Sequence, residues 1–254
     1  MRGRRIPLSR ARRLVIDFLH FAAAIPTVPV QRRVHLRPVI DARAALLDRP
    51  PWSAIFTKAF AVVSAEFPEL RRAFVKLPWH HLYEYPKPVA SIAIERDFDG
   101  DKAVLCARIK DPGSLSLAEI TRRVRSFCER PIGEIKDFRR ALRMCRYPRF
   151  ARRALWWLGL NHPLYRIRHF GTFGVSVYSA LGAESLHPLC PLTTILNYGV
   201  FTEDGDVDVR VVYDHRVMDG AIVARALARL EEVLTGPIVD ELRSMAEIKA
   251  SRAA

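Results

Sequence analysis

Glycine is scarce in this chain of 254 residues, with 12, and there is no Gly/Ser-rich linker, internal repeat or low-complexity segment. No boundary between domains is therefore visible. No apolar run approaches the roughly 20 residues that a membrane-spanning helix needs. The longest candidate, Leu14 to Pro26, is interrupted by Asp17 and His20, and no small-residue cleavage site follows it, which argues against a signal peptide. We expect one domain over residues 1–254, long enough to bury a sizeable core.

Cysteine is also scarce, and no two cysteines form a CxxC pair. The four are Cys106, Cys128, Cys145 and Cys190. This spacing excludes the common zinc clusters, and a disulfide framework is unusual in a chain of this size. The adjacent His80 and His81 rarely point at one ion, so they do not predict a metal site. We expect no bound metal, buried reduced thiols and a cytoplasmic protein, with peripheral attachment to a membrane as the alternative.

Acidic residues are few relative to basic ones, 27 against 41, and the net charge is +14. Residues 1–13 contain six Arg and no acid, and residues 121–170 contain 14 Lys and Arg against three acids. Charge concentrated in this way predicts an anionic partner, such as a phosphate-bearing cofactor, an acidic carrier protein, an anionic membrane or a nucleic acid. The alternative is a basic surface that only aids solubility. The sequence contains no nucleic-acid-binding motif, so we do not expect a nucleic acid as the partner.

Periodicity predicts both helices and strands. The expected helices cover residues 11–24, 52–66, 116–128, one or two within 134–158, and a last one through Val223 to Leu234. The expected strands cover residues 29–36, 89–95, 103–109, 173–178, 194–201 and 207–213. Asp99-Gly100 and Asp204-Gly205 are typical of hairpin turns, and Ser116 with Glu119 has the spacing of a helix capping box. Helices mixed with hairpins indicate an α/β fold with a mixed sheet.

The segment most informative about chemistry runs from Asp214 to Gly220 and reads DHRVMDG. It lies where a strand ends and a helix begins, so His215 can leave the sheet and enter a cleft. Asp219 falls at the cap of the following helix, where a carboxylate can accept backbone N–H bonds, and Gly220 permits a tight turn. The structural alternative is a strand-to-helix turn with a partly buried histidine.

Several segments together resemble a known family. DHRVMDGA followed by an amphipathic helix, GTFGVS (Gly171–Ser176), LCPLTTILNYG (Leu189–Gly199) and the helix from Trp52 to Leu70 occur in the family's order. They are similar to motifs of the acyltransferase (dihydrolipoyl transacetylase) component of 2-oxoacid dehydrogenase complexes. Chloramphenicol acetyltransferase and the condensation domains of peptide synthetases are related to that component. The resemblance covers about residues 10–240.

This resemblance implies the CoA-dependent acyltransferase fold, a two-layer α/β sandwich with a mixed sheet, and a homotrimer with active sites at subunit interfaces. It implies that His215 is the general base and that Ser176 stabilises the oxyanion. Asp219 matches a structural carboxylate that pairs with an arginine of the first helix, here Arg13 or, by a less direct match, Arg12. Asp219 is then better placed to hold the turn than to contact the ring of His215. The implied co-substrate is a thioester of coenzyme A or of an acyl carrier protein, with no permanently bound cofactor.

The sequence also departs from the family. No lipoyl domain and no peripheral subunit-binding domain is expected before the catalytic unit. The segment 131–170 is unlike the short connection of the dehydrogenase component. In this segment Trp156 and Trp157 lie close to two arginines, Arg152 and Arg153. The two tryptophans are candidates for binding a long acyl chain or a membrane surface. The alternative is that they pack in the core. Thr172 is a further candidate for substrate binding.

The leading hypothesis is therefore an acyltransferase that moves an acyl group from a thioester to a hydroxyl or amine. One alternative is a lipoamide-dependent transacylase that serves a dehydrogenase complex. Another is a non-catalytic trimeric scaffold, against which the intact His215, Ser176 and Asp219 speak.

Overall fold

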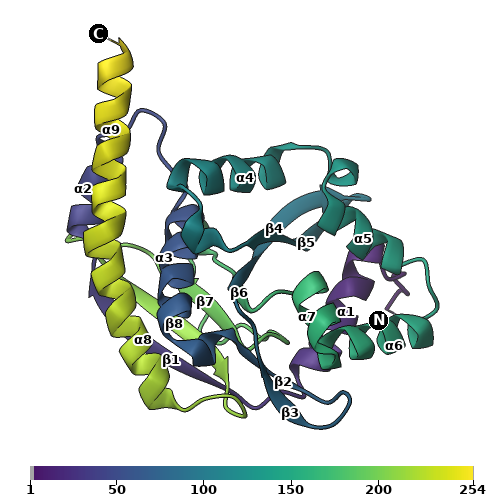
Figure 1. Ribbon diagram of the computed structural model, residues 1–254. Helices are drawn as coiled ribbons and strands as arrows, with labels where there is room; N and C mark the ends of the chain where they lie inside the picture. Colours follow the sequence, from purple (N-terminus) through teal and green to yellow (C-terminus); the bar gives the residue numbers. More distant parts are fainter. Residues whose placement is uncertain (1–2, 254) are drawn as a thin grey trace.

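The computed structural model describes residues 3–253, and their side chains up to residue 247. Its centre is a mixed six-stranded sheet in the order β1-β8-β7-β6-β4-β5, beside a two-stranded ribbon of β2 and β3 (Figure 1). The strands are β1 Thr27–His35, β2 Arg72–Val75, β3 His81–Glu84, β4 Val89–Phe98, β5 Asp101–Lys110, β6 Phe173–Val175, β7 Thr194–Tyr198 and β8 Asp206–Asp214. The short β6 runs parallel to both neighbours, and the other pairs are antiparallel.

Helices form the second layer. They are α1 Arg10–Ala22, α2 Arg37–Ala44, α3 Trp52–Glu66, α4 Leu117–Glu129, α5 Lys136–Met144, α6 Arg149–Asn161, α7 Pro163–His169, α8 Gly220–Val233 and α9 Val239–Ala253. Helices α3, α4 and α8 bury their apolar faces on one side of the sheet and enclose the main core. Helices α1, α5, α6 and α7 gather beside the edge strand β5 (Figure 1). No helix in the described part of the chain is long and apolar enough to cross a bilayer.

The predicted α/β architecture with a mixed sheet is confirmed, and so are both hairpins. Asp99 and Gly100 adopt positive φ angles of 53° and 73° between β4 and β5, as a tight two-residue connection requires. Ser116 caps α4, because its hydroxyl accepts the backbone N–H of Glu119 at 3.2 Å. These features depend on neighbouring residues alone, which is why the sequence predicts them.

Several predictions need correction. The strand expected over residues 173–178 ends at Val175, because the chain then leaves the sheet. The ribbon of β2 and β3 was not predicted. Only Cys145 and Cys190 are buried, whereas the other two thiols are exposed. Of the six arginines in residues 1–13, Arg2 lies outside the described residues.

Candidate functional site

The turn that carries His215 is held by its neighbours. The carboxylate of Asp214, which is 1% exposed, accepts hydrogen bonds from the backbone N–H of Arg216 and from its guanidinium, at 2.7 to 3.0 Å. The guanidinium of Arg216 lies 4.6 Å from the ring centroid of Phe74. The backbone N–H of His215 donates to the carbonyl of Pro26 at 3.0 Å. The histidine therefore leaves the end of β8 on a fixed backbone.

The ring of His215 has a defined proton arrangement. Its Nδ1 lies 3.2 Å from the carbonyl oxygen of Met218. A carbonyl can only accept, so Nδ1 carries the proton in the neutral ring and Nε2 keeps its lone pair. The side chain is 49% exposed. The arrangement therefore presents Nε2 as a base.

Asp219 occupies the predicted N-cap position of α8, but its side chain makes no capping hydrogen bond. Its carboxylate is 82% exposed and lies 3.6 Å from Nδ1 of His215. The expectation that Asp219 holds the turn rather than approaching the ring is therefore wrong. An exposed pair of this kind contributes little stability.

The predicted pair of Asp219 with Arg13 is absent among the described residues. Arg13 lies in α1, whose main contacts are with β5, α6 and α5, and its charge acts on the thiol of Cys145. Gly220 is the first residue of α8 and lacks a positive φ angle. A Cβ there would lie 3.3 Å from the hydroxyl of Tyr213, which is a tight contact.

Ser176 follows the last residue of β6 and is half-buried. Its backbone N–H donates to the carbonyl of Leu196 at 3.1 Å, which extends the pairing of β6 with β7 by one residue. Side chains alternate along a strand, so Ser176 shares the face of Gly174. A Cβ on Gly174 would meet Ile195 and the thiol of Cys190, away from the helices that enclose the main core. Ser176 therefore lies on the sheet face opposite α3 and α8.

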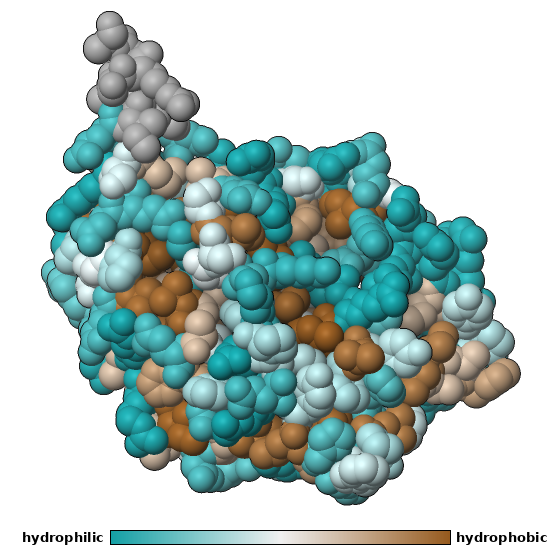
Figure 2. Space-filling view, in the orientation of Figure 1, coloured by the Kyte–Doolittle hydropathy of each residue, from teal (hydrophilic) through white to brown (hydrophobic). Residues whose placement is uncertain are grey.

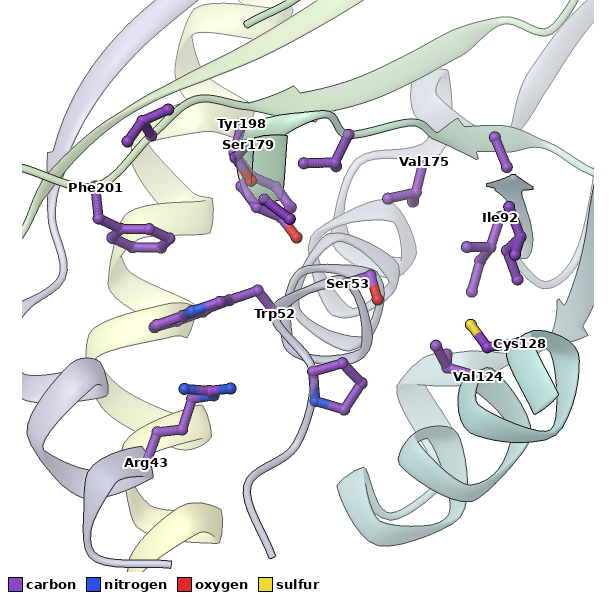
Figure 3. Close-up of a pocket in the computed structure, with 16 residues that line it drawn as sticks. Arg43, Trp52, Ser53, Ile92, Val124, Cys128, Val175, Ser179, Tyr198 and Phe201 are labelled. Carbon is purple, nitrogen blue, oxygen red and sulfur yellow. The ribbon is translucent and has the colours of Figure 1, made fainter. Parts of the chain in front are cut away.

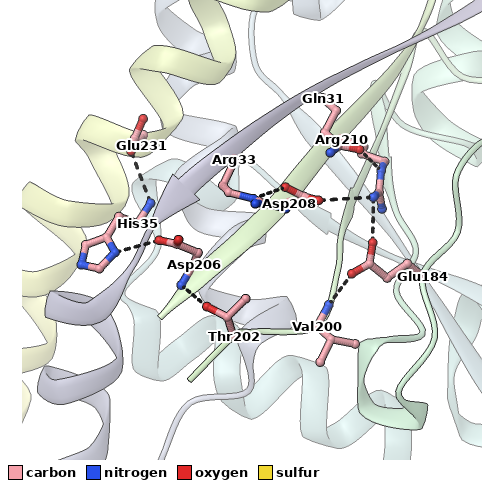
Figure 4. Close-up of polar contacts among 10 residues, drawn as sticks. All are labelled: Gln31, Arg33, His35, Glu184, Val200, Thr202, Asp206, Asp208, Arg210 and Glu231. Atoms are coloured by element: carbon pink, nitrogen blue, oxygen red, sulfur yellow. Dashed lines mark hydrogen bonds and ion pairs between the residues drawn. The ribbon is translucent and has the colours of Figure 1, made fainter. Parts of the chain in front are cut away.

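Sequence reasoning missed a row of polar side chains beside Ser176. Across the sheet, the register places Asn197 next to Ser176, Arg210 opposite Asn197, and Gln31 opposite Arg210. The guanidinium of Arg210 binds Gln31 at 2.5 Å and Glu184 at 2.7 Å (Figure 4). No signal within β7 or β8 alone could have revealed this row, because it depends on register between strands.

Asn197 is fully buried, and neither atom of its side-chain amide has a hydrogen-bond partner among the described residues. The same holds for Nη1 of Arg210, on the neighbouring strand. An unpaired buried polar group costs about 1–3 kcal/mol. Adjacent strands lie about 4.8 Å apart, so the amide of Asn197 is within reach of both Ser176 and Arg210.

One chain does not bring His215 and Ser176 together. Asp214 pairs with Thr193 at the start of β7, whereas Ser176 lies beside Asn197, four residues further along. At about 3.3 Å per residue, the backbone of Ser176 lies about 13 Å along the strands from that of Asp214, and His215 lies one residue further away. A single carbonyl cannot contact both groups within one chain.

The three candidates for substrate binding have other neighbours. The hydroxyl of Thr172 bonds both the N–H and the carbonyl of Val89, at 2.9 and 3.2 Å, so it joins β4 to β6. Trp156 is 8% exposed and packs against Phe21 and Phe170, with ring centroids 6.1 and 4.9 Å apart. The assignment of Thr172 and Trp156 to substrate binding is therefore corrected to packing.

Trp157 differs from Trp156 in being 42% exposed. Phe150 of α6 and Leu164 of α7 are exposed as well. Hydrophobic side chains are exposed at several places on the face shown in Figure 2, so this exposure is not confined to α6 and α7. The preceding Arg152 does not share this exposure. It is 7% exposed and binds the fully buried Asp17 of α1 at 2.6 Å.

The thiols are poor candidates for a nucleophile. Burial raises the pKa of Cys190 to about 12, so the thiol stays protonated near neutral pH. No group of three or more His, Cys, Asp or Glu among the described residues is arranged to hold a metal ion.

Comparison with solved structures identifies the fold. The dihydrolipoamide acetyltransferase of Azotobacter vinelandii matches with a TM-score of 0.70 and 18% identity over 95% of this chain and 94% of that chain. That structure was used to examine a serine, a histidine and an asparagine in the catalytic mechanism, the asparagine four positions after the histidine. In this chain Asp219 stands four positions after His215.

Two further structures are similar. The cubic core of a pyruvate dehydrogenase multienzyme complex matches with a TM-score of 0.69 and 17% identity over 95% of this chain and 94% of that chain. A chloramphenicol acetyltransferase matches with a TM-score of 0.52 and 12% identity over 90% and 96%. No protein-family model matches the sequence, and no curated protein matches it. At these identities the likeness shows the fold, which is the predicted CoA-dependent acyltransferase fold.

Proposed function

We propose that this chain, which has the fold of acyltransferase catalytic cores, transfers an acyl group from a thioester to a hydroxyl or amine acceptor. The observation that carries the proposal is the ring of His215 at the end of β8. Its Nδ1 proton is bound by the carbonyl of Met218, so Nε2 is free to accept a proton. A thioester is already activated, so the enzyme needs a base and an oxyanion donor but no covalent nucleophile.

In the proposed reaction, Nε2 of His215 takes the proton of the acceptor hydroxyl or amine as its oxygen or nitrogen attacks the thioester carbonyl carbon. The carbonyl oxygen becomes an oxyanion that accepts a hydrogen bond from the hydroxyl of Ser176. The tetrahedral intermediate then expels the thiolate, which takes the proton from the imidazolium. The products are an ester or amide and a free thiol.

Asn197 and Arg210 act as positioning residues in this proposal. The amide N–H of Asn197 would donate to the oxygen of Ser176 and direct the serine proton toward the oxyanion. The amide oxygen would accept from Nη1 of Arg210, whose charge polarises the amide. This arrangement satisfies the buried polar atoms that have no partner among the described residues.

We further propose a homotrimer in which each active site is shared by two subunits. The separation of about 13 Å or more between His215 and Ser176 supports this. A site is complete only where His215 of one protomer faces Ser176 of the next. The cubic core among the similar structures is consistent with an assembly of many copies.

Coenzyme A and an acyl carrier protein are both suitable donors, because one carries phosphates and the other is acidic, whereas the chain is basic. The alternative donor is a lipoamide thioester supplied by another chain, and that reaction would use the same base, His215, and the same oxyanion donor, Ser176. A non-catalytic trimeric scaffold would assemble without turnover.

The test follows release of the thiol from an acyl-CoA in the presence of hydroxyl and amine acceptors. We expect His215→Ala to lower the rate by about 100-fold to 10,000-fold, the usual contribution of a placed general base. Ser176→Ala should cost about 100-fold with little change in KM. The control is His35→Ala. His35 is an exposed histidine at the end of β1, far from His215, and it is paired with Asp206. Full activity in the His215 variant would refute the proposal.

A further inference from the structure

A cavity of about 620 Å³ lies between the sheet and the helices α3 and α4, at the carboxyl ends of β6 and β7 (Figure 3). Its lining is mostly apolar and includes Trp52, Ile92, Val124, Val175, Tyr198 and Phe201. Its size falls within the roughly 300–1,000 Å³ that is usual for small-molecule sites. The reaction proposed above makes no use of this cavity.

Aromatic rings form one wall. Trp52 stacks on Phe201 with ring centroids 4.4 Å apart, and Tyr198 stacks on Phe56 at 4.1 Å. Arg43 is the only charged residue among those that line the cavity. Its guanidinium lies 4.9 Å from the ring centroid of Trp52 and donates to the carbonyl of Pro50. The cavity therefore suits an uncharged aliphatic group.

The cavity reaches the strand end that carries Ser176. Val175 and Val177 both line it, and they flank Ser176 in the chain. β4 pairs with β6 only over Ala90 to Ile92, although β4 itself continues to Phe98. At the point where this pairing ends, Ala93 lines the cavity.

Ala93 also lies next to Ser176 in register, since Ile92 pairs with Val175. Ser176 does not line the cavity, and its side chain lies on the other face of the sheet. Among the described residues, no backbone pair joins β4 to β6 beyond Ile92 and Val175, so the sheet is not closed between these two strands at this point. An acyl chain whose carbonyl is held at the hydroxyl of Ser176 would enter the cavity through this gap in the pairing.

We propose that this cavity holds the aliphatic chain of a medium- or long-chain acyl thioester, so that the acyl group transferred is longer than acetyl. The proposal rests on the function proposed above. A methylene has about the volume of a water molecule, about 30 Å³, so a cavity of about 620 Å³ has room for up to about 20 carbons. Burying one methylene is worth a factor of up to about four in affinity.

The experiment measures the dissociation constants of acetyl-, octanoyl- and dodecanoyl-CoA by calorimetry, with His215→Ala in the full chain so that no turnover occurs. We expect affinity to rise steeply from acetyl to octanoyl and to go on rising to dodecanoyl, by up to about fourfold per methylene, because twelve carbons do not fill the cavity. Equal affinities across the series would overturn the proposal.

A plugging variant assigns the effect to the cavity. Cys128 projects into it from α4, toward Ile92 and Val175 (Figure 3). Cys128→Phe should lower octanoyl-CoA affinity at least about tenfold and leave acetyl-CoA affinity unchanged. Ser126→Phe is the matched control, since it adds the same ring to α4 at a residue that does not line the cavity. Ser53→Phe plugs the opposite wall and repeats the test if the Cys128 variant does not fold.

Two outcomes separate this inference from the proposed function. If Cys128→Phe weakens all three ligands equally, the cavity does not hold the chain, whereas loss of turnover in His215→Ala would still support acyl transfer. If no acyl-CoA is turned over by the wild type but affinity rises with chain length, the cavity binds acyl chains and the proposed reaction is wrong.

Discussion

Two inactive variants should restore each other's activity if the active site is shared between subunits. His215→Ala keeps Ser176, and Ser176→Ala keeps His215. His215 and Ser176 are about 13 Å or more apart along the sheet of one chain, so the two residues of the same chain cannot act on one reacting thioester and its acceptor. In a ring of three protomers, each site takes its histidine from one subunit and its serine from the next.

The size of the recovery can be worked out. When equal amounts of the two variants assemble at random, about one site in four receives an intact histidine and an intact serine. Each variant alone retains about 1% of wild-type activity or less. The mixture should therefore reach about 25% of wild-type activity.

The assay co-expresses the variants with different affinity tags, purifies the mixed assemblies and measures thiol release from octanoyl-CoA. A mixture of His215→Ala with the double variant His215→Ala/Ser176→Ala is the control, because it contains no intact histidine. Mixed assemblies that are confirmed by native mass spectrometry, yet remain as inactive as the single variants, would refute the shared site.

If Asn197 acts through Ser176, Asn197→Ala should lower kcat about tenfold or more in the otherwise wild-type protein. It should have no further effect when Ser176 is already replaced by Ala. Additive losses in this double-mutant cycle would show that the two residues act independently. Asp17→Asn should lower the free energy of unfolding by about 3–5 kcal/mol in urea titrations, because it leaves the buried Arg152 without its anionic partner. Replacing both residues, with Asp17→Leu and Arg152→Met, should recover most of this loss. An unchanged urea midpoint for Asp17→Asn would contradict the prediction. Burial, together with the nearby Arg140, lowers the pKa of His169 to about 4. Its folded-state pKa is below the unfolded value of about 6.5, so the neutral ring stabilises the fold above that pH and this stability is lost as pH falls toward about 4. His169→Gln should flatten the pH dependence of the thermal midpoint in that range, and an unchanged profile would exclude His169 as its source.

Local features of this protein were predictable from the sequence. The Asp99-Gly100 turn, the Ser116 cap and the helix over Trp52–Glu66 all appear where expected. Each depends on interactions between residues that are close along the chain. His215 was also predictable as a site residue, because its surroundings come from the adjacent turn from Asp214 to Gly220.

Partners distant along the chain were not predictable. The resemblance implied that Arg13 pairs with Asp219, whereas α1 instead supplies Asp17 to Arg152, which lies 135 residues away. The charge of an arginine or aspartate indicates that it needs an oppositely charged partner when buried, but it does not indicate which residue is that partner. Packing of α1 beside α6 decided that choice.

The sequence by itself determined most strands of the central sheet and the helices that cover it, the basic character and the histidine at the end of a strand. Only the tertiary structure decided which groups surround Ser176. The row of Asn197 and Arg210 follows from the register of β6, β7 and β8, and the cavity follows from the early end of β6 against a longer β4. The physical reason is that register and strand length are set by packing over the whole sheet, whereas turns, caps and helix starts are set by the few residues that form them.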